Sequence, residues 1–213
     1  AVPNSGMAGD VVGVPVRPGV GVDPDGAKRE RGLRMWGLDP DRTTILVTGG
    51  SQGAVSINTA LADAVGPLTG AGYQILHAYG RKNDAPVKHD HYTAVPYIDD
   101  MEAAYAVADV VVCRSGAMTV AENSAASLPA IYIPLPHGNG EQGLNSAHLV
   151  ATGAALRIDD AVLSGEALVE KLLPLLDPEV RAAMRAALED SGAGSVAEDL
   201  AARIAAAAGK DKQ

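Results

Sequence analysis

Short apolar runs alternate along this chain with longer segments in which apolar residues recur at helical spacing. The runs predict strands at six places, each bounded by glycine, proline or polar residues: 43–48, 73–80, 92–98, 110–113, 130–136 and 154–159. A run at 10–17, interrupted by Pro15, predicts one more short strand. Strands that alternate with helices form parallel sheets. The pattern therefore predicts an α/β fold, a doubly wound, parallel, Rossmann-like sheet with helices on both faces.

The segments between the strands carry helix signals. A short surface helix is expected within 24–37, ending at Gly37, and a helix over 101–108 follows the capping residues Asp99 and Asp100. Further helices are predicted from 117 onward, over 143–152, and two or three times within the Ala-rich stretch 163–208. The helix that follows the strand 43–48 has an expected apolar stripe made of Val55, Ile57, Leu61, Ala62 and Val65.

Length and composition favour one folded domain. A chain of 213 residues with 47% hydrophobic content can bury a sizeable core. We assign residues 10–208 to this domain, residues 1–9 to a linker or cut end because they are small and polar and lack an initiating Met, and 209–213 to a frayed tail. Apolar runs stay well below the roughly 20 residues that span a bilayer, so a cytoplasmic protein is expected.

The charge balance excludes some classes of partner. A net charge of -9 argues against a general nucleic-acid binder and against electrostatic adhesion to an anionic membrane, both of which need a basic face. A polyanionic ligand would have to be held by local groups. The single cysteine, Cys113, ends an apolar run and is expected to be a buried thiol rather than a nucleophile.

A glycine-rich loop, Gly49-Gly50-Ser51-Gln52-Gly53, follows the strand 43–48 directly and precedes a helix. Glycines let the backbone approach a ligand closely, and the N–H groups of a helix start can bind phosphate. The loop lacks the Lys-Ser/Thr ending of a P-loop and is not a complete GxGxxG dinucleotide motif, so NAD binding is disfavoured.

The segment from Val110 to Glu122 is the centre of the predicted nucleotide site. An apolar strand turns at Ser115-Gly116 into a helix, which would direct the N–H groups of residues 117–119 at a diphosphate. Glu122 lies one or two turns into that helix, where its carboxylate could accept hydrogen bonds from a ribose 2′,3′-diol. The alternative is an ordinary strand-turn-helix with a solvated glutamate, because a Ser-Gly turn alone is a weak motif.

Other polar residues have two readings as well. Arg17, held in extended backbone between Pro15 and Pro18, is either a phosphate clamp or an exposed loop arginine. Gln142 and Asn145 either bind sugar hydroxyls or serve as helix caps or solvated polar groups. His89 and His91 suggest a metal pair, but no further ligands cluster with them, so a solvated loop and no metal site are expected.

The candidate loops all follow strands of the predicted sheet. In a parallel sheet the carboxyl ends of the strands lie along one edge, where ligands bind. We therefore expect residues 49–53, Ile98, residues 115–119 and residues 137–142 to share one rim.

Three motifs, in the right order, resemble the carboxy-terminal half of the MurG family of peptidoglycan N-acetylglucosaminyltransferases. They are GGSQGA at 49–54, YIDDMEAAYAVADVVVCRSGAMTVAE at 97–122 and LPAIYIPLPHGNGEQGLNSA at 128–147, and the match extends from VVGVPVR at 11–17 to the last helices. The resemblance implies a GT-B fold, of which this chain would be the domain that binds UDP-N-acetylglucosamine.

The resemblance also implies roles for individual residues. Arg17 and the loop residues Gly50, Ser51, Gln52 and Gly53 would face the diphosphate, together with the helix start at Ser115, Gly116, Ala117, Met118 and Thr119. The Ile98 backbone would pair with the uracil edge beside Met101, Glu122 would bind the ribose hydroxyls, and Gln142 would bind the sugar. Many members have Gln-Gln where this chain has Glu141-Gln142, so Gln142 is the stronger candidate.

The family transfers N-acetylglucosamine with inversion to lipid I, forming lipid II, without an obligatory metal or other cofactor. By resemblance, the catalytic base, the acceptor pocket and the contacts with the cytoplasmic face of the membrane belong to an amino-terminal domain, so this chain alone would bind donor without turnover. The alternatives are a stand-alone donor subunit of a split transferase and another UDP-sugar enzyme of the same fold, such as an epimerase or a natural-product glycosyltransferase.

Overall fold

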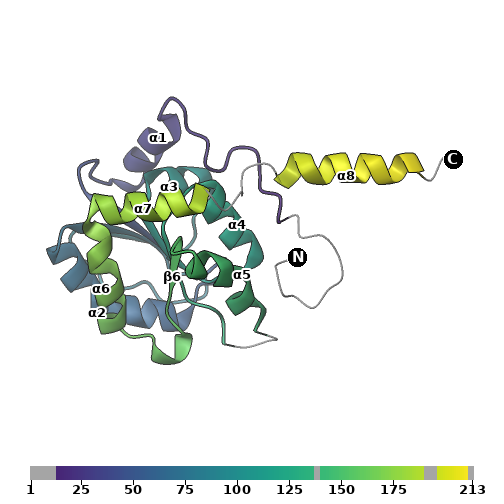
Figure 1. Ribbon diagram of the computed structural model, residues 1–213. Coiled ribbons are helices and arrows are strands. Elements are labelled where there is room, and N and C mark those ends of the chain that lie inside the picture. The colour runs from purple at the N-terminus through teal and green to yellow at the C-terminus, as the bar shows by residue number, and fades with distance from the viewer. Residues whose placement is uncertain (1–12, 137–139, 190–195, 211–213) are drawn as a thin grey trace.

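A computed structural model describes residues 13–136, 140–189 and 196–210 (Figure 1). Within these residues, six parallel strands form one sheet in the order β3-β2-β1-β4-β5-β6. The strands are β1 (Thr43–Thr48), β2 (Tyr73–Ala78), β3 (Tyr92–Val95), β4 (Val110–Cys113), β5 (Ala130–Tyr132) and β6 (Ala155–Arg157). The helices are α1 (Ala27–Trp36), α2 (Val55–Gly70), α3 (Met101–Val107), α4 (Ala117–Ala125), α5 (Glu141–Ala151), α6 (Gly165–Leu172), α7 (Pro178–Glu189) and α8 (Val196–Lys210), with short 3-10 turns η1 (Asp160–Val162) and η2 (Leu173–Leu176). The predicted fold class is confirmed.

Both faces of the sheet are covered, because its strands are apolar on both sides. Alternate residues of one strand enter different cores: Leu46 belongs to the core that includes residues of α1, α3, α4 and α5, whereas Ile45 and Val47 belong to the core that includes residues of α2 and α6. All four residues of β4 are buried, as expected for a central strand of a parallel sheet. Helix α8 extends away from the sheet and its covering helices (Figure 1).

Several sequence predictions need correction. Residues 13–17 form no strand, because Gly13 has φ +82 and Pro15 lacks an N–H donor, while residues 10–12 lie outside the described part. The strands 73–80, 92–98, 130–136 and 154–159 are each shorter than predicted. In the stripe of α2, Val55 (70% exposed) and Ala62 face solvent, whereas Ala60, Ala64 and Leu68 are buried. Helix α8 continues through Gly209 and Lys210, which were assigned to the tail.

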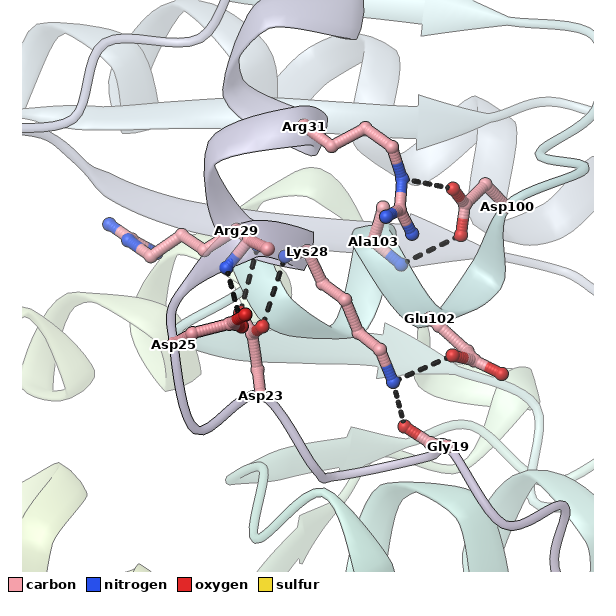
Figure 2. Close-up of polar contacts among 10 residues, drawn as sticks. Gly19, Asp23, Asp25, Lys28, Arg29, Arg31, Asp100, Glu102 and Ala103 are labelled. Atoms are coloured by element: carbon pink, nitrogen blue, oxygen red, sulfur yellow. Dashed lines mark hydrogen bonds and ion pairs between the residues drawn. The ribbon is translucent and has the colours of Figure 1, made fainter.

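Helix α1 is attached to α3 by close packing and by a polar cluster (Figure 2). The Arg31 Nε donates to Asp100 Oδ2 at 2.8 Å, and Lys28 Nζ pairs with Glu102 Oε2 at 2.7 Å and also donates to the Gly19 carbonyl. The hydrogen bond from Arg31 lowers the pKa of the Asp100 carboxyl. Gly32 allows the helices to touch, since a Cβ there would lie 2.6 Å from Val107 Cγ1. The segment that follows Arg17 is thereby fixed on the body of the domain.

Asp100 also caps α3, as its sequence position predicted. Its Oδ1 accepts from the Ala103 N–H at 3.0 Å, while its other oxygen binds Arg31. One carboxylate therefore sets both the start of α3 and the position of α1.

His77 is a buried histidine of β2, 1% exposed. Asn58 Nδ2 donates to the Tyr79 carbonyl, so Asn58 Oδ1 faces His77 Nε2 at 3.1 Å, and the Tyr92 hydroxyl lies 2.7 Å from Nδ1. Burial lowers the pKa of His77 to about 4. The side chain is thus neutral and hydrogen-bonded at both ring nitrogens.

Protonation of His77 is expected to destabilise the fold on acidification. Between the ordinary pKa of 6.5 and the folded value of about 4, the unfolded chain binds the proton more readily, so stability rises with pH in this window. Between pH 7 and 4.5 the loss is on the order of 2 kcal/mol. Urea unfolding across this range should show a shallower pH slope for His77→Gln, whereas His89→Gln, at an exposed position, should keep the slope; an unchanged slope in His77→Gln would contradict the assignment.

Candidate functional site

The strand order reverses between β1 and β4, and a crevice lies beside that point. Its volume is about 630 Å³, and it is lined by loops that follow β1 and β4 and by the segment before α3. Crevices at such switch points are the ligand sites of doubly wound sheets. The lining residues are Thr48, Gly49, Gly50, Ser51, Gly53, Ala54, Val55, Ala78, Tyr97, Ile98, Met101, Tyr105, Cys113, Arg114, Gly116, Thr119, Glu122, Leu135 and Gln142.

The glycine loop forms one wall and depends on close backbone contact. A Cβ at Gly53, where φ is +74, would lie 2.1 Å from the Tyr79 carbonyl oxygen. Asn83 Nδ2 donates to both the Gln52 and Tyr79 carbonyls, at 2.9 and 2.8 Å. These contacts hold the loop against the end of β2, so that the start of α2 opens toward the crevice.

The starts of α4 and α5 are held together at the opposite wall. Ser115 is fully buried; its Oγ donates to the Gln142 carbonyl at 2.8 Å, and its own carbonyl accepts from Asn145 Nδ2 at 3.0 Å. Gly116 precedes α4 in extended geometry, with φ −62 and ψ 148. Because the first N–H groups of a helix have no partner within it, two groups of donors and the positive ends of two helix dipoles lie side by side here.

Glu122 places a carboxylate in the crevice. Its Oε2 accepts from the Tyr105 hydroxyl at 2.9 Å, and its Oε1 lies 3.3 Å from Arg17 Nη2. The Glu122 side chain is 14% exposed and that of Arg17 is 61% exposed. Arg17 and Glu122, separated by 105 residues in the sequence, are therefore neighbours at the edge of the crevice.

A third group of lining residues comes from the turn before α3. Ile98 is 3% exposed, and Met101 packs against the core beside it. Tyr97 is exposed at the rim, where the Arg81 guanidinium lies 4.4 Å from its ring centroid. This part of the crevice lining is thus apolar and is flanked by an aromatic ring.

Arg114 is a lining residue that the sequence reading did not single out. It pairs with Asp160, donates to the Ile133 and Pro134 carbonyls, and reaches Ser56 Oγ at 2.9 Å. Its side chain is 13% exposed. Its position directly after the apolar strand, where a cation is costly unless paired, is the signal that could have identified it.

Most of the candidate residues lie together, and the others lie next to them. Gly50, Ser51, Gly53, Ile98, Met101, Gly116, Thr119, Glu122 and Gln142 line the crevice. Gln52, Ala117 and Met118 are exposed outside the lining, and Ser115 is buried behind it, so these four contribute no lining side chain. Of residues 137–142, Gln142 lines the crevice, Gly140 and Glu141 are exposed outside the lining, and residues 137–139 lie outside the described part. Each of the four predicted segments thus contributes at least one described residue to the crevice.

The cysteine Cys113 is buried at the end of β4. Burial raises the pKa of the Cys113 thiol to about 12, and Asn123 Nδ2 lies 3.3 Å from its sulfur, so the thiol is a structural group. In the described part of the chain, no three His, Cys, Asp or Glu side chains gather as metal ligands. The described helices include none with the length and apolarity to cross a membrane.

Solved structures share this architecture. The crystal structure of Acinetobacter baumannii MurG matches with a TM-score of 0.66 and 26% identity, over 79% of this chain and 51% of that chain. The calicheamicin glycosyltransferase matches at 21% identity with a TM-score of 0.62, over 82% of this chain and 46% of that one, which is a likeness of fold alone. The fold is that of the carboxy-terminal domain of a GT-B glycosyltransferase.

Sequence comparison defines the family. The glycosyltransferase family 28 C-terminal domain matches residues 44–204, and the chain belongs to that family. It is 52% identical over 210 residues, 98% of this chain and 58% of the relative, to a Corynebacterium efficiens protein named UDP-N-acetylglucosamine–N-acetylmuramyl-(pentapeptide) pyrophosphoryl-undecaprenol N-acetylglucosamine transferase. A Mycolicibacterium smegmatis protein of the same name is 49% identical over 199 residues, 90% of this chain and 52% of that protein. The chain thus spans little more than half the length of these relatives.

Proposed function

We propose that this chain is the donor-binding half of a peptidoglycan N-acetylglucosaminyltransferase and that the crevice between the ends of β1 and β4 binds UDP-N-acetylglucosamine. The observation that carries the proposal is the placement of the Glu122 carboxylate in the crevice, beside the start of α4. A carboxylate accepts the two hydrogen bonds of a ribose diol, and a helix start binds phosphate. The assignment of N-acetylglucosamine as the donor sugar and of a lipid-linked muramyl compound as the acceptor rests on the names of the relatives.

Each part of the donor has a counterpart in the crevice. The uracil lies against Ile98 and Met101, with the Ile98 backbone at its polar edge, and the ribose lies on Glu122. The diphosphate lies between the N–H groups at the start of α4 and the glycine loop. The Arg17 Nη2 lies 3.3 Å from Glu122 Oε1. From this position beside the ribose site, the Arg17 side chain contacts the adjoining phosphate.

Gln142 is placed for the sugar. Its Oε1 accepts from the Leu135 N–H at 3.0 Å, which fixes the orientation of the amide and leaves its NH₂ group to donate to a sugar hydroxyl. Glu141, exposed at the start of α5, offers only acceptor atoms.

The leaving diphosphate gains charge as the glycosidic bond breaks. The helix starts and Arg17 stabilise that charge without a metal. The catalytic base and the acceptor pocket lie in an amino-terminal half. That half also brings the complete protein to lipid I at the cytoplasmic face of the plasma membrane. This chain, with its nucleotide-sugar domain at residues 10–208, binds donor but does not transfer the sugar by itself.

Calorimetric titration tests the proposed donor. The chain should bind UDP-N-acetylglucosamine saturably, UDP-glucose more weakly and GDP hardly at all. Equal affinity for the two UDP-sugars would contradict the assignment of the sugar, and tighter binding of GDP would contradict the uridine site.

A further inference from the structure

Tyr105 is the one residue in the described part of α3 that combines a core position with a hydroxyl at the crevice. It is 5% exposed and belongs to the same core as Ile98 and Ala104, yet it also lines the crevice. Its hydroxyl donates to Glu122 Oε2 at 2.9 Å. A side chain of one helix thus reaches the functional carboxylate of another.

The direction of this hydrogen bond is fixed by chemistry. A tyrosine hydroxyl has one hydrogen, and a carboxylate can only accept. Burial, and after it the neighbouring Glu122 charge, raises the pKa of the Tyr105 hydroxyl, so it stays protonated at neutral pH. The bond occupies Oε2 and leaves Oε1 as the oxygen that Arg17 approaches at 3.3 Å.

A buried tyrosine on an apolar helix face is ordinarily a core residue that bonds to the nearest acceptor. Tyr73 shows that arrangement in this chain, since its hydroxyl donates to the Leu172 carbonyl away from the crevice. Tyr105 differs because its acceptor lines the crevice and because α3 begins three residues after Ile98. Helix α3 is held by Arg31 and Lys28 of α1 (Figure 2). This one short helix therefore connects the proposed uracil and ribose parts of the site.

We propose that Tyr105 is a positioning residue that holds the Glu122 carboxylate in the orientation that binds the ribose diol, and that it thereby sets the preference of the site for ribonucleotides over 2′-deoxyribonucleotides. This inference rests on the proposed function, since it needs the ribose at Glu122. Without the hydroxyl, Glu122 Oε2 loses the hydrogen bond from α3, and the carboxylate is free to rotate away from the diol. Loss of the Tyr105 hydroxyl must then weaken the binding of nucleotides that possess the 2′-hydroxyl more than the binding of 2′-deoxynucleotides.

The variant Tyr105→Phe tests the role, with UDP and 2′-deoxy-UDP as probes. It keeps the ring in the core and removes the one hydrogen bond. Calorimetry should show UDP affinity reduced about fivefold and 2′-deoxy-UDP affinity changed less than about twofold, as expected for the loss of a single hydrogen bond to the ribose-binding group. In Tyr105→Phe/Glu122→Ala, the further loss relative to Glu122→Ala should be negligible.

Tyr92→Phe is the matched control, because it removes a hydroxyl that bonds to His77 outside the crevice. It should keep the ratio of the two nucleotide affinities. A Tyr105→Phe variant that keeps this ratio, whether or not both affinities fall, would leave Tyr105 a structural residue and overturn the inference while the proposed function stands. No UDP binding by the unchanged chain would overturn the proposed function and the inference with it.

Discussion

Glu122→Ala is expected to weaken UDP binding by about 10- to 100-fold, the loss that follows when charged hydrogen bonds are removed. The substitution removes the only carboxylate among the described lining residues of the crevice. It also leaves the buried Tyr105 hydroxyl without its acceptor, which should cost about 1–2 kcal/mol of stability. Calorimetric titration with UDP and urea unfolding measure the two effects separately.

Glu30→Ala is the control for Glu122→Ala. Glu30 is also a glutamate paired with an arginine, Arg34, but both side chains are about two-thirds exposed on α1, away from the crevice. The control should keep UDP affinity and stability almost unchanged, since exposed pairs contribute little. Unchanged UDP affinity in a folded Glu122→Ala variant would remove the ribose assignment.

Gly53→Ala is expected to destabilise the domain by about 3 kcal/mol and to abolish measurable UDP binding. The added Cβ would meet the Tyr79 carbonyl oxygen at 2.1 Å, and φ +74 disfavours a side chain in any case. The loop must therefore move off the end of β2, and with it the backbone groups that face the crevice. Urea unfolding and UDP titration are the measurements.

Substitutions at two further glycines distinguish the steric contact with Tyr79 from backbone strain as causes of the stability lost in Gly53→Ala. Gly50, with φ +86, has open space around its Cβ position, so Gly50→Ala should cost only about 1 kcal/mol from backbone strain. Gly66 lies inside α2 with open space, so Gly66→Ala should stabilise by roughly 0.5–1 kcal/mol. Equal effects of Gly53→Ala and Gly50→Ala would contradict the role of the close contact with Tyr79.

The sheet could be predicted because its strands are continuous apolar runs between turn residues. Thr43–Thr48 and Val110–Cys113 are buried on both faces, and such runs leave little choice of structure. Residues 13–17, the described part of the run at 10–17, were wrongly predicted as a strand, since strand formation depends on a neighbouring strand that periodicity cannot reveal. Val55 was wrongly placed in the core because its position at the start of α2 lines the crevice, whereas Ile57 two residues later is buried against the sheet.

The location of the site at one edge of the sheet could be predicted from the sequence, whereas the contacts between its side chains could not. Loops that follow parallel strands must share an edge, so the common rim follows from the alternation of strands and helices in the sequence. The pairing of Arg17 with Glu122 and the bond from Tyr105 depend on tertiary packing across 105 and 17 residues. Tyr105 was not among the predicted site residues because an aromatic residue at helical spacing is typical of a core position. Its ring is indeed in the core, and only its hydroxyl reaches Glu122.

The most direct test of the account is to map where UDP binds, by backbone amide chemical shifts of the isotope-labelled chain titrated with UDP. The account predicts that the largest changes occur at Ile98, at Gly116 to Thr119 and at Gly50 to Gly53, the three walls of the crevice. Changes concentrated elsewhere on the molecule, with these amides unmoved at saturating UDP, would contradict the central claim that the β1 and β4 ends form the nucleotide site.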